Sequence, residues 1–89
     1  MTNPILIPDL NAKIELLLRS DRFTIKTASE LSKRMDIGPD YLSRFRNGSR
    51  AMPEEHLLKL CKIFGLEQRE WYSDVETFGK RLGFSRKQI

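Results

Sequence analysis

Four polar side chains between positions 40 and 47 have the spacing of one helix face. Asp40, Ser43, Arg44 and Asn47 follow one another at intervals of three, one and three residues. The guanidinium of Arg44 can donate two hydrogen bonds to guanine O6 and N7, or it can hold a phosphate. Asn47 carries the groups to pair with adenine or a phosphate, and the hydroxyl of Ser43 can serve either purpose. The four residues are therefore candidates for base readout in DNA, with Arg44 ranked first.

Asp40 differs from the other three because its carboxylate cannot hold a phosphate. Facing a base, it could only accept a hydrogen bond, most plausibly from cytosine N4. A second interpretation places it in the first turn of a helix, where a negative charge stabilises the positive end of the helix dipole. Both interpretations stay open, and stabilisation of the helix end is favoured.

A second group of residues could hold phosphates without reading bases. The N–H groups of Ala28 and Ser29, with Thr27 beside them, begin a predicted helix and form a candidate anion site. The flanking basic and polar candidates are Lys26, Lys33, Arg46, Ser49 and Arg50. For the lysines, a solvated surface position explains the residue type equally well. Arg50 follows Gly48 in a predicted loop.

Two predicted helices joined by a tight turn position these candidates. The first begins at Thr27, where the run Thr27–Glu30 has the spacing of a capping box, and it ends near Asp36. The second starts with Pro39, whose fixed φ suits the first helical position, and it ends at the Asn47-Gly48 pair. The expected inward-facing residues are Leu31, Met35, Ile37, Tyr41, Leu42 and Phe45, with Ser32 as the small residue where the helices cross.

The remaining apolar residues predict three further helices. One follows Asp9 and carries Leu10, Ile14, Leu17 and Leu18, after which Phe23 and Ile25 plug the core. Another runs from about Pro53 to Phe64, with Leu57, Leu58, Leu60, Cys61 and Phe64 as core candidates. The last begins near Glu67 and carries Trp71, Val75, Phe78 and Leu82. Residues 1–89 are thus expected to form one all-α domain of five short helices without a sheet.

The segment from residue 27 to residue 66 resembles the Cro/C1-type, or Xre-type, helix-turn-helix family of phage repressors and bacterial regulators. That family typically shows T-x-x-E-L-A, then P-S-Y-L-S-R-I-E-R-G, then P-S-L-E-x-L-L-K-I-A-x-x-L-G. This chain offers TASELS, PDYLSRFRNG and MPEEHLLKLCKIFGL, without gaps and over about half its length. The resemblance implies a lambda-repressor-like domain of five helices, in which helices 2 and 3 form the motif at about residues 27–48. It also implies groove-facing positions at Gly38, Pro39, Asp40, Ser43, Arg44 and Asn47. Because the family uses the loop after the third helix on the DNA backbone, the resemblance also favours a phosphate contact for Arg50.

The chain departs from the family pattern at four positions of the motif. Asp36 replaces the usual turn glycine, and aspartate tolerates a left-handed backbone. Ser32 replaces alanine at the crossing. Arg46 stands where the family usually has glutamate, which replaces a structural carboxylate with a positive group. Asn47 stands where arginine is frequent, so these departures bear on specificity more than on fold.

Other function classes find little support in the residues. No Gly-rich phosphate loop or metal-ligand spacing occurs, so we expect no enzyme activity, metal or cofactor. His56 is interpreted as a surface side chain and Cys61 as a buried, inert thiol. The longest apolar run has three residues, which predicts no membrane span, and the N-terminus lacks a secretion signal, so a cytoplasmic protein is expected.

The net charge of +4 and the basic segment at residues 77–89 favour contact with phosphates of double-stranded DNA. We expect a sequence-specific transcriptional regulator, most simply a repressor, that binds a palindromic operator as a homodimer. The candidate dimer interface lies within residues 67–89, at Phe78, Leu82 and Phe84, and the apolar stretch PILI near the N-terminus is expected to pack across it. The alternative is an antitoxin, or another protein-interaction module, that uses the same fold to bind a partner protein.

Overall fold

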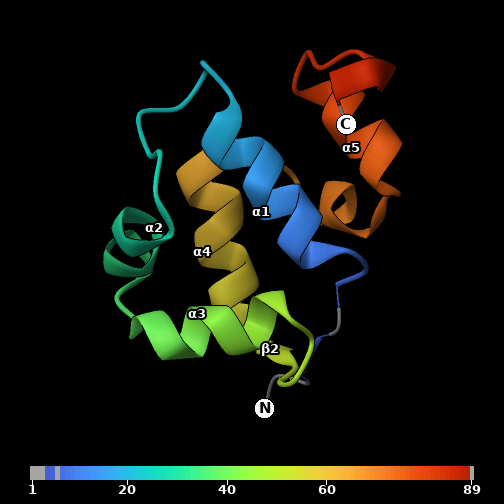
Figure 1. The fold of residues 1–89 in the computed structure, drawn as a ribbon. Helices are drawn as coiled ribbons and strands as arrows, with labels where there is room; N and C mark the ends of the chain where they lie inside the picture. Colours follow the sequence, from blue (N-terminus) through green and yellow to red (C-terminus); the bar gives the residue numbers. More distant parts are fainter. Residues whose placement is uncertain (1–3, 6, 89) are drawn as a thin grey trace.

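The computed structural model describes residues 4, 5 and 7–88, and in this part of the chain five α-helices form the body of the domain (Figure 1). The α-helices are α1 (Leu10–Arg19), α2 (Ala28–Met35), α3 (Pro39–Arg46), α4 (Glu54–Phe64) and α5 (Val75–Arg81). Two short 3₁₀ helices, η1 (Gln68–Tyr72) and η2 (Arg86–Gln88), flank α5. The predicted all-α domain of five helices is confirmed.

The helices enclose one apolar core. α1 contacts α3 and α5, α2 contacts α3 and α4, and α3 runs across one end of α1 and α4 (Figure 1). The side chains without solvent exposure come from α1, α2, α4 and η1 and are Ile14, Leu17, Leu31, Met35, Leu57, Leu60 and Trp71. Ile25 from the connector between α1 and α2 is also buried, and Phe23 lies edge-on against Phe64 at 5.0 Å. These positions agree with the predicted apolar faces.

The start of α2 and the turn into α3 fold as expected for a helix-turn-helix. Thr27 Oγ1 accepts a hydrogen bond from the N–H of Glu30 at 3.1 Å, and its hydroxyl donates to Glu30 Oε1 at 3.3 Å. Asp36 ends α2 with φ of 57°, in the left-handed region that the usual turn glycine would occupy. Ser32 is buried at the crossing, and its hydroxyl donates to the carbonyl of Ser29 at 2.9 Å. Gly48, with φ of 78°, lets the chain leave α3.

The prediction of one continuous helix from Glu67 to Leu82 is wrong. The chain breaks between η1 and α5, and the carboxylate of Asp74 caps the new helix by accepting from the N–H of Thr77 at 2.7 Å. A capping box between Glu67 and Glu70 starts η1. Because the break turns the chain, Trp71 and Phe78 pack against each other at 5.3 Å instead of following one helical stripe.

The prediction of no sheet is wrong in one small respect. β1 (Pro4–Ile5) and β2 (Met52–Pro53) pair antiparallel, with Ile5 opposite Met52. The PILI stretch was expected at a dimer interface, but its first two residues pair within the chain, while Leu6 lies outside the described residues. Sequence periodicity could not find this ladder because two residues carry no alternation.

For several side chains, the structure differs from the predicted burial or exposure. Phe78 and Leu82 are only 2% and 5% exposed, so they belong to the core. Their prediction as dimer-interface residues is therefore wrong. Phe84 is half-buried, with the guanidinium of Arg19 5.5 Å from its ring centroid. Tyr41 and Leu58, both predicted inside, are 40% and 50% exposed.

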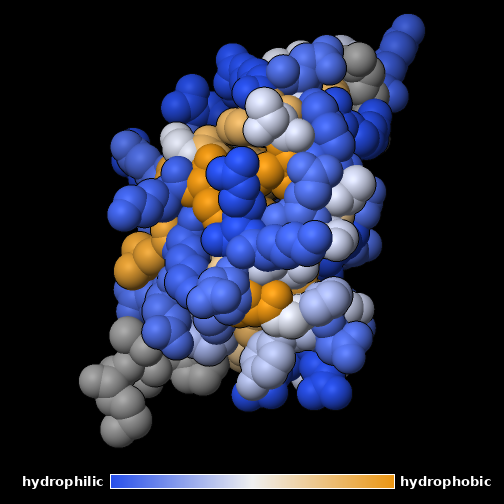
Figure 2. Space-filling model, turned by 90° about the vertical axis from the view of Figure 1, so that its left-hand side faces the viewer, coloured by the Kyte–Doolittle hydropathy of each residue, from blue (hydrophilic) through white to orange (hydrophobic). Residues whose placement is uncertain are grey.

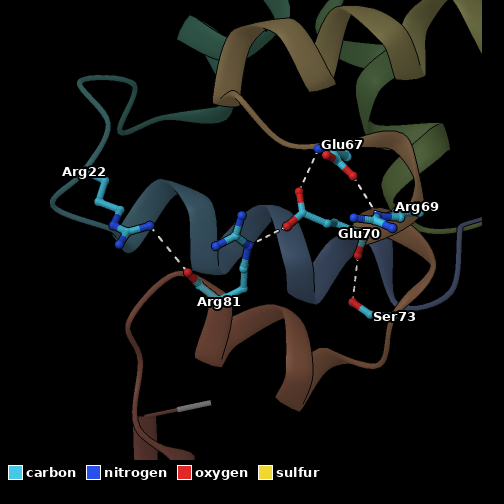
Figure 3. A network of polar contacts seen from close by, with 6 residues as sticks. All are labelled: Arg22, Glu67, Arg69, Glu70, Ser73 and Arg81. Carbon is cyan, nitrogen blue, oxygen red and sulfur yellow. Dashed lines mark hydrogen bonds and ion pairs between the residues drawn. The ribbon is translucent and has the colours of Figure 1, made fainter.

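Polar contacts at α1 and η1 hold the second half of the chain in place. The ammonium of Lys13 is fully buried and donates to the carbonyls of Pro8 at 2.7 Å and Trp71 at 2.6 Å. Figure 3 shows the carboxylate of Glu70 between α5 and the start of η1, accepting from Arg81 Nε at 2.5 Å and from the N–H of Glu67 at 2.6 Å. These bonds tie η1 to α1 and α5.

Candidate nucleic-acid interface

The outer face of α3 carries the four predicted base-reading residues. Asp40, Ser43, Arg44 and Asn47 are all exposed, whereas Leu42 and Phe45 on the inner face are buried. Gly38 and Pro39, which precede this face, are exposed as well. The structure brings the predicted residues together on one helix surface, and their contact with bases stays a prediction.

The side-chain orientation of Asn47 is set by the loop that follows it. Its Oδ1 accepts a hydrogen bond from the N–H of Ser49 at 2.9 Å. Because an N–H group can bond only to the oxygen of the amide, the Nδ2 group keeps its two donors, and the second lone pair of Oδ1 can still accept. Adenine, guanine and a phosphate therefore all remain candidate partners of Asn47.

The loop after α3 is folded back on to the end of the helix. The N–H of Arg50 donates to the carbonyl of Arg44 at 3.2 Å, and the hydroxyl of Ser49 reaches the same carbonyl at 3.4 Å. Ser49 thus directs its N–H and its hydroxyl toward its own chain. Among the two loop candidates for phosphate contact, Arg50 is the better one.

Arg50 lies on the exposed ring of Tyr41. The guanidinium carbon is 4.5 Å from the ring centroid, and the ring itself stands edge-on to Phe45 at 5.7 Å. Stacking engages the flat face of a guanidinium and leaves its N–H groups, which point outward in the plane, free to donate. Tyr41 was expected in the core, so its role beside the α3 surface was missed. The contact between the Arg50 guanidinium and the Tyr41 ring is visible only in the three-dimensional structure.

Arg46 does not belong to the phosphate-binding candidates. Its Nε donates to Asn11 Oδ1 at 2.8 Å, and its Nη2 forms an ion pair with Glu15, so the side chain is only 16% exposed. The guanidinium joins α3 to α1. The family resemblance places a glutamate at this position, and here the positive charge on α3 meets an acid on α1. Helix periodicity gave no signal for this pairing.

The start of α2 carries the second group of candidate phosphate contacts. α2 begins at Ala28, so the N–H groups of Ala28 and Ser29 have no partner inside the helix. Thr27 is engaged with Glu30, and Lys26 donates to the carbonyl of Ser20 at 2.5 Å, which fixes its ammonium at the end of α1. Ser29 and Lys33 are exposed. The start of α2 and the loop at Arg50 thus supply candidate phosphate contacts from outside the outer face of α3.

Comparison with protein families identifies this arrangement. The model of the Cro/C1-type HTH DNA-binding domain matches residues 17–70, more than half of the chain. The chain belongs to this family. The Cro/C1-type match contains α2, α3 and α4 completely, together with the exposed α3 face and the loop after it. Neither a curated protein nor a solved structure shows significant similarity to the chain.

His56 and Cys61 of this Cro/C1-type domain contribute to packing. The His56 ring lies 5.7 Å from that of Phe45, and burial, aided by the neighbouring Lys59, lowers the pKa of His56 below its usual value. Its prediction as a surface side chain is therefore wrong in part, since it is half-buried. Cys61 is half-buried rather than buried, and this burial raises the pKa of its thiol above the usual value.

Two features of the described residues bear on the other function classes. Among them, no group of three or more His, Cys, Asp or Glu side chains could hold a metal ion. No helix in the described ranges is long and apolar enough to cross a membrane. The family itself is defined by DNA binding and is not an enzyme family.

Proposed function

We propose that this Cro/C1-type domain is a sequence-specific transcriptional repressor that binds a palindromic operator as a homodimer. The observation that carries the proposal is the exposed α3 face, with Arg44 at its centre and the Arg50 guanidinium stacked beside it. One helix of eight residues reads few base pairs, and a second linked reader raises the effective affinity. The half-sites are then expected about 10 bp apart on one side of the duplex. A cytoplasmic location is part of the same proposal.

The dimer interface is proposed on the outer surface of residues 67–89. Phe78 and Leu82 are excluded from it because the core holds them, whereas Phe84 is half-buried and Tyr72 is 44% exposed. Tyr72→Ser and Phe84→Ser should shift the protein toward monomer in sedimentation equilibrium. Leu58→Ser, at an exposed leucine of α4, serves as the control.

The proposed repressor function is tested by selecting bound sequences from random DNA at physiological salt. We expect a two-fold-symmetric motif and loss of binding in the double variant Arg44→Ala with Arg50→Ala. Arg22→Ala is the matched control because Arg22 is an exposed arginine of the connector after α1, outside residues 67–89 and outside the candidate DNA contacts. Enrichment no greater than for non-specific binding, or unchanged affinity of the double variant, would contradict the proposal.

A second candidate function is a protein-binding module, such as an antitoxin that also binds DNA. The start of the α3 face supports it, because Gly38 and Pro39 carry no charge and Asp40 is negative. The exposed Leu58 on α4 supports it as well. Neighbouring-gene context discriminates: an adjacent small toxin-like reading frame favours the antitoxin, and a divergent promoter with inverted repeats favours the repressor.

A further inference from the structure

A shallow groove lies between the end of α2 and the outer side of α4. It encloses about 240 Å³, and its lining residues are Arg34, Met35, Asp36, Lys59, Lys62 and Ile63. Figure 2 looks on to the side of the molecule that carries α2, and there apolar atoms are exposed between hydrophilic side chains. The volume is below the roughly 300–1,000 Å³ of typical small-molecule sites, so the groove is too small for a cofactor.

The groove has an apolar floor. Met35 is fully buried beneath it, and Ile63 is half-buried along its α4 side. One turn before Lys62, Leu58 adds a second exposed aliphatic side chain to the outer side of α4. The helix therefore presents apolar atoms to solvent on the side that does not face the core.

Positive charge surrounds this floor. The lining contains three cations, Arg34, Lys59 and Lys62, against a single acid, Asp36. The ammonium of Lys59 is fixed at the rim because it donates to the carbonyl of Met35 at 2.9 Å. Arg34 and Lys62 are exposed, and neither forms an ion pair with an acid of the described residues. The rim thus keeps a net positive charge.

The apolar floor and the positive rim together favour one class of occupant for the groove. DNA could neutralise the cations, but it offers no aliphatic side chains for the floor. A second copy of this groove would place cations opposite cations. We propose that the groove docks an acidic amphipathic helix of a partner protein, with aliphatic side chains against the half-buried Ile63 and carboxylates against Arg34 and Lys62.

This docking site is separate from the outer face of α3. None of its lining residues belongs to the base-reading candidates Asp40, Ser43, Arg44 and Asn47. A DNA-bound domain could therefore hold the partner at the same time. The proposal goes beyond the repressor function and does not depend on it.

A fluorescence anisotropy titration of the full 89-residue protein tests the proposal. The probe is a labelled synthetic peptide that forms a helix with leucines on one face and glutamates on the other. A peptide of the same composition, with its leucines spread around the helix, is the control ligand. The double variant Arg34→Glu with Lys62→Glu should bind the probe roughly tenfold more weakly or worse. Ile63→Ala should weaken binding as well.

A matched variant separates the groove from general effects of charge. Arg22→Glu reverses an exposed charge of the connector after α1 that does not line the groove, so it should bind the probe normally. Circular dichroism melting checks that every variant is folded, and binding to the selected operator should be unchanged throughout.

Three results would overturn the docking proposal. The first is a probe that does not bind, or that binds no more tightly than the control peptide. The second is a double variant that loses DNA affinity and keeps its affinity for the probe, which would make the rim a phosphate contact. The third is a double variant that changes the oligomeric state, which would assign the groove to a second copy. Operator binding is measured separately, so failure of the repressor proposal remains distinguishable.

Discussion

Arg46 on α3 forms an ion pair with Glu15 on α1, with Asn11 accepting from the same guanidinium at 2.8 Å. The contact crosses 31 residues of sequence and anchors the last turn of the helix that carries the base-reading candidates. Arg46, which was predicted to contact a phosphate, therefore stabilises the orientation of α3.

Breaking this pair should destabilise the domain, and reversing both charges should restore it. Arg46→Ala is expected to cost about 1 kcal/mol, because Glu15 is half exposed and the Asn11 bond is lost too. Glu15→Arg with Arg46→Glu should recover most of the loss in urea denaturation. A double variant less stable than either single charge reversal would contradict the pairing.

Tyr41 should support DNA binding through Arg50. Tyr41→Leu keeps an apolar contact with Phe45 but removes the π face, so operator affinity should fall by about 0.5–1 kcal/mol, or roughly twofold to fivefold. Tyr41→Phe should bind like the wild-type protein. In the background of Arg50→Ala, Tyr41→Leu should cause little further loss, and an additive loss would mean that Tyr41 acts independently.

Asn47 should act on DNA as a donor. Asn47→Asp keeps an oxygen for the N–H of Ser49, so the loop should remain folded, while both amide donors are lost and a negative charge is added. Affinity should fall about tenfold or more, because a removed charge-assisted bond contributes roughly 1.5–3 kcal/mol. An Asn47→Asp variant that binds the operator as tightly as the wild-type protein would show that the donor assignment is wrong.

Acid should weaken the contact between η1 and α5. The hydrogen bond from Arg81, with that from the Glu67 N–H and despite partial burial, holds the pKa of Glu70 below its usual 4.5. The folded state therefore binds this proton less readily than the unfolded chain, so the stabilisation is present above about pH 4.5 and disappears as the pH falls through the lowered pKa. Glu70→Gln should lower Tm near pH 7 and flatten the loss of Tm in acid. Glu55→Gln, at an exposed glutamate of α4, should leave the profile unchanged.

Lys13 should prove necessary for stability despite its charge. Lys13→Met retains most of the buried aliphatic chain but leaves the carbonyls of Pro8 and Trp71 without their donor, at a cost of about 1–3 kcal/mol. Guanidinium denaturation measures this loss. Lys80→Met, at an exposed lysine of α5, should change stability by less than about 0.5 kcal/mol.

The sequence by itself determined the local structure of the motif. The threonine before α2, the aspartate in the turn and Pro39 at the start of α3 act through neighbouring backbone groups, so their effects can be predicted from spacing alone. The same holds for the exposed face of α3, because helix periodicity assigns Ser43 and Arg44 to the side opposite Leu42.

Tertiary structure alone decided how the side chains are used. Periodicity reports that a residue lies on a helix face, but it does not report which element covers that face. Phe78 became a core residue because the chain turns at Asp74, and Arg46 became a bridge because α1 places Glu15 against it. The ring of Tyr41 contacts the guanidinium of Arg50 because Gly48 turns the loop back along α3. Each of these outcomes depends on contacts between residues that are distant in sequence or separated by a turn, whose geometry local propensities do not encode.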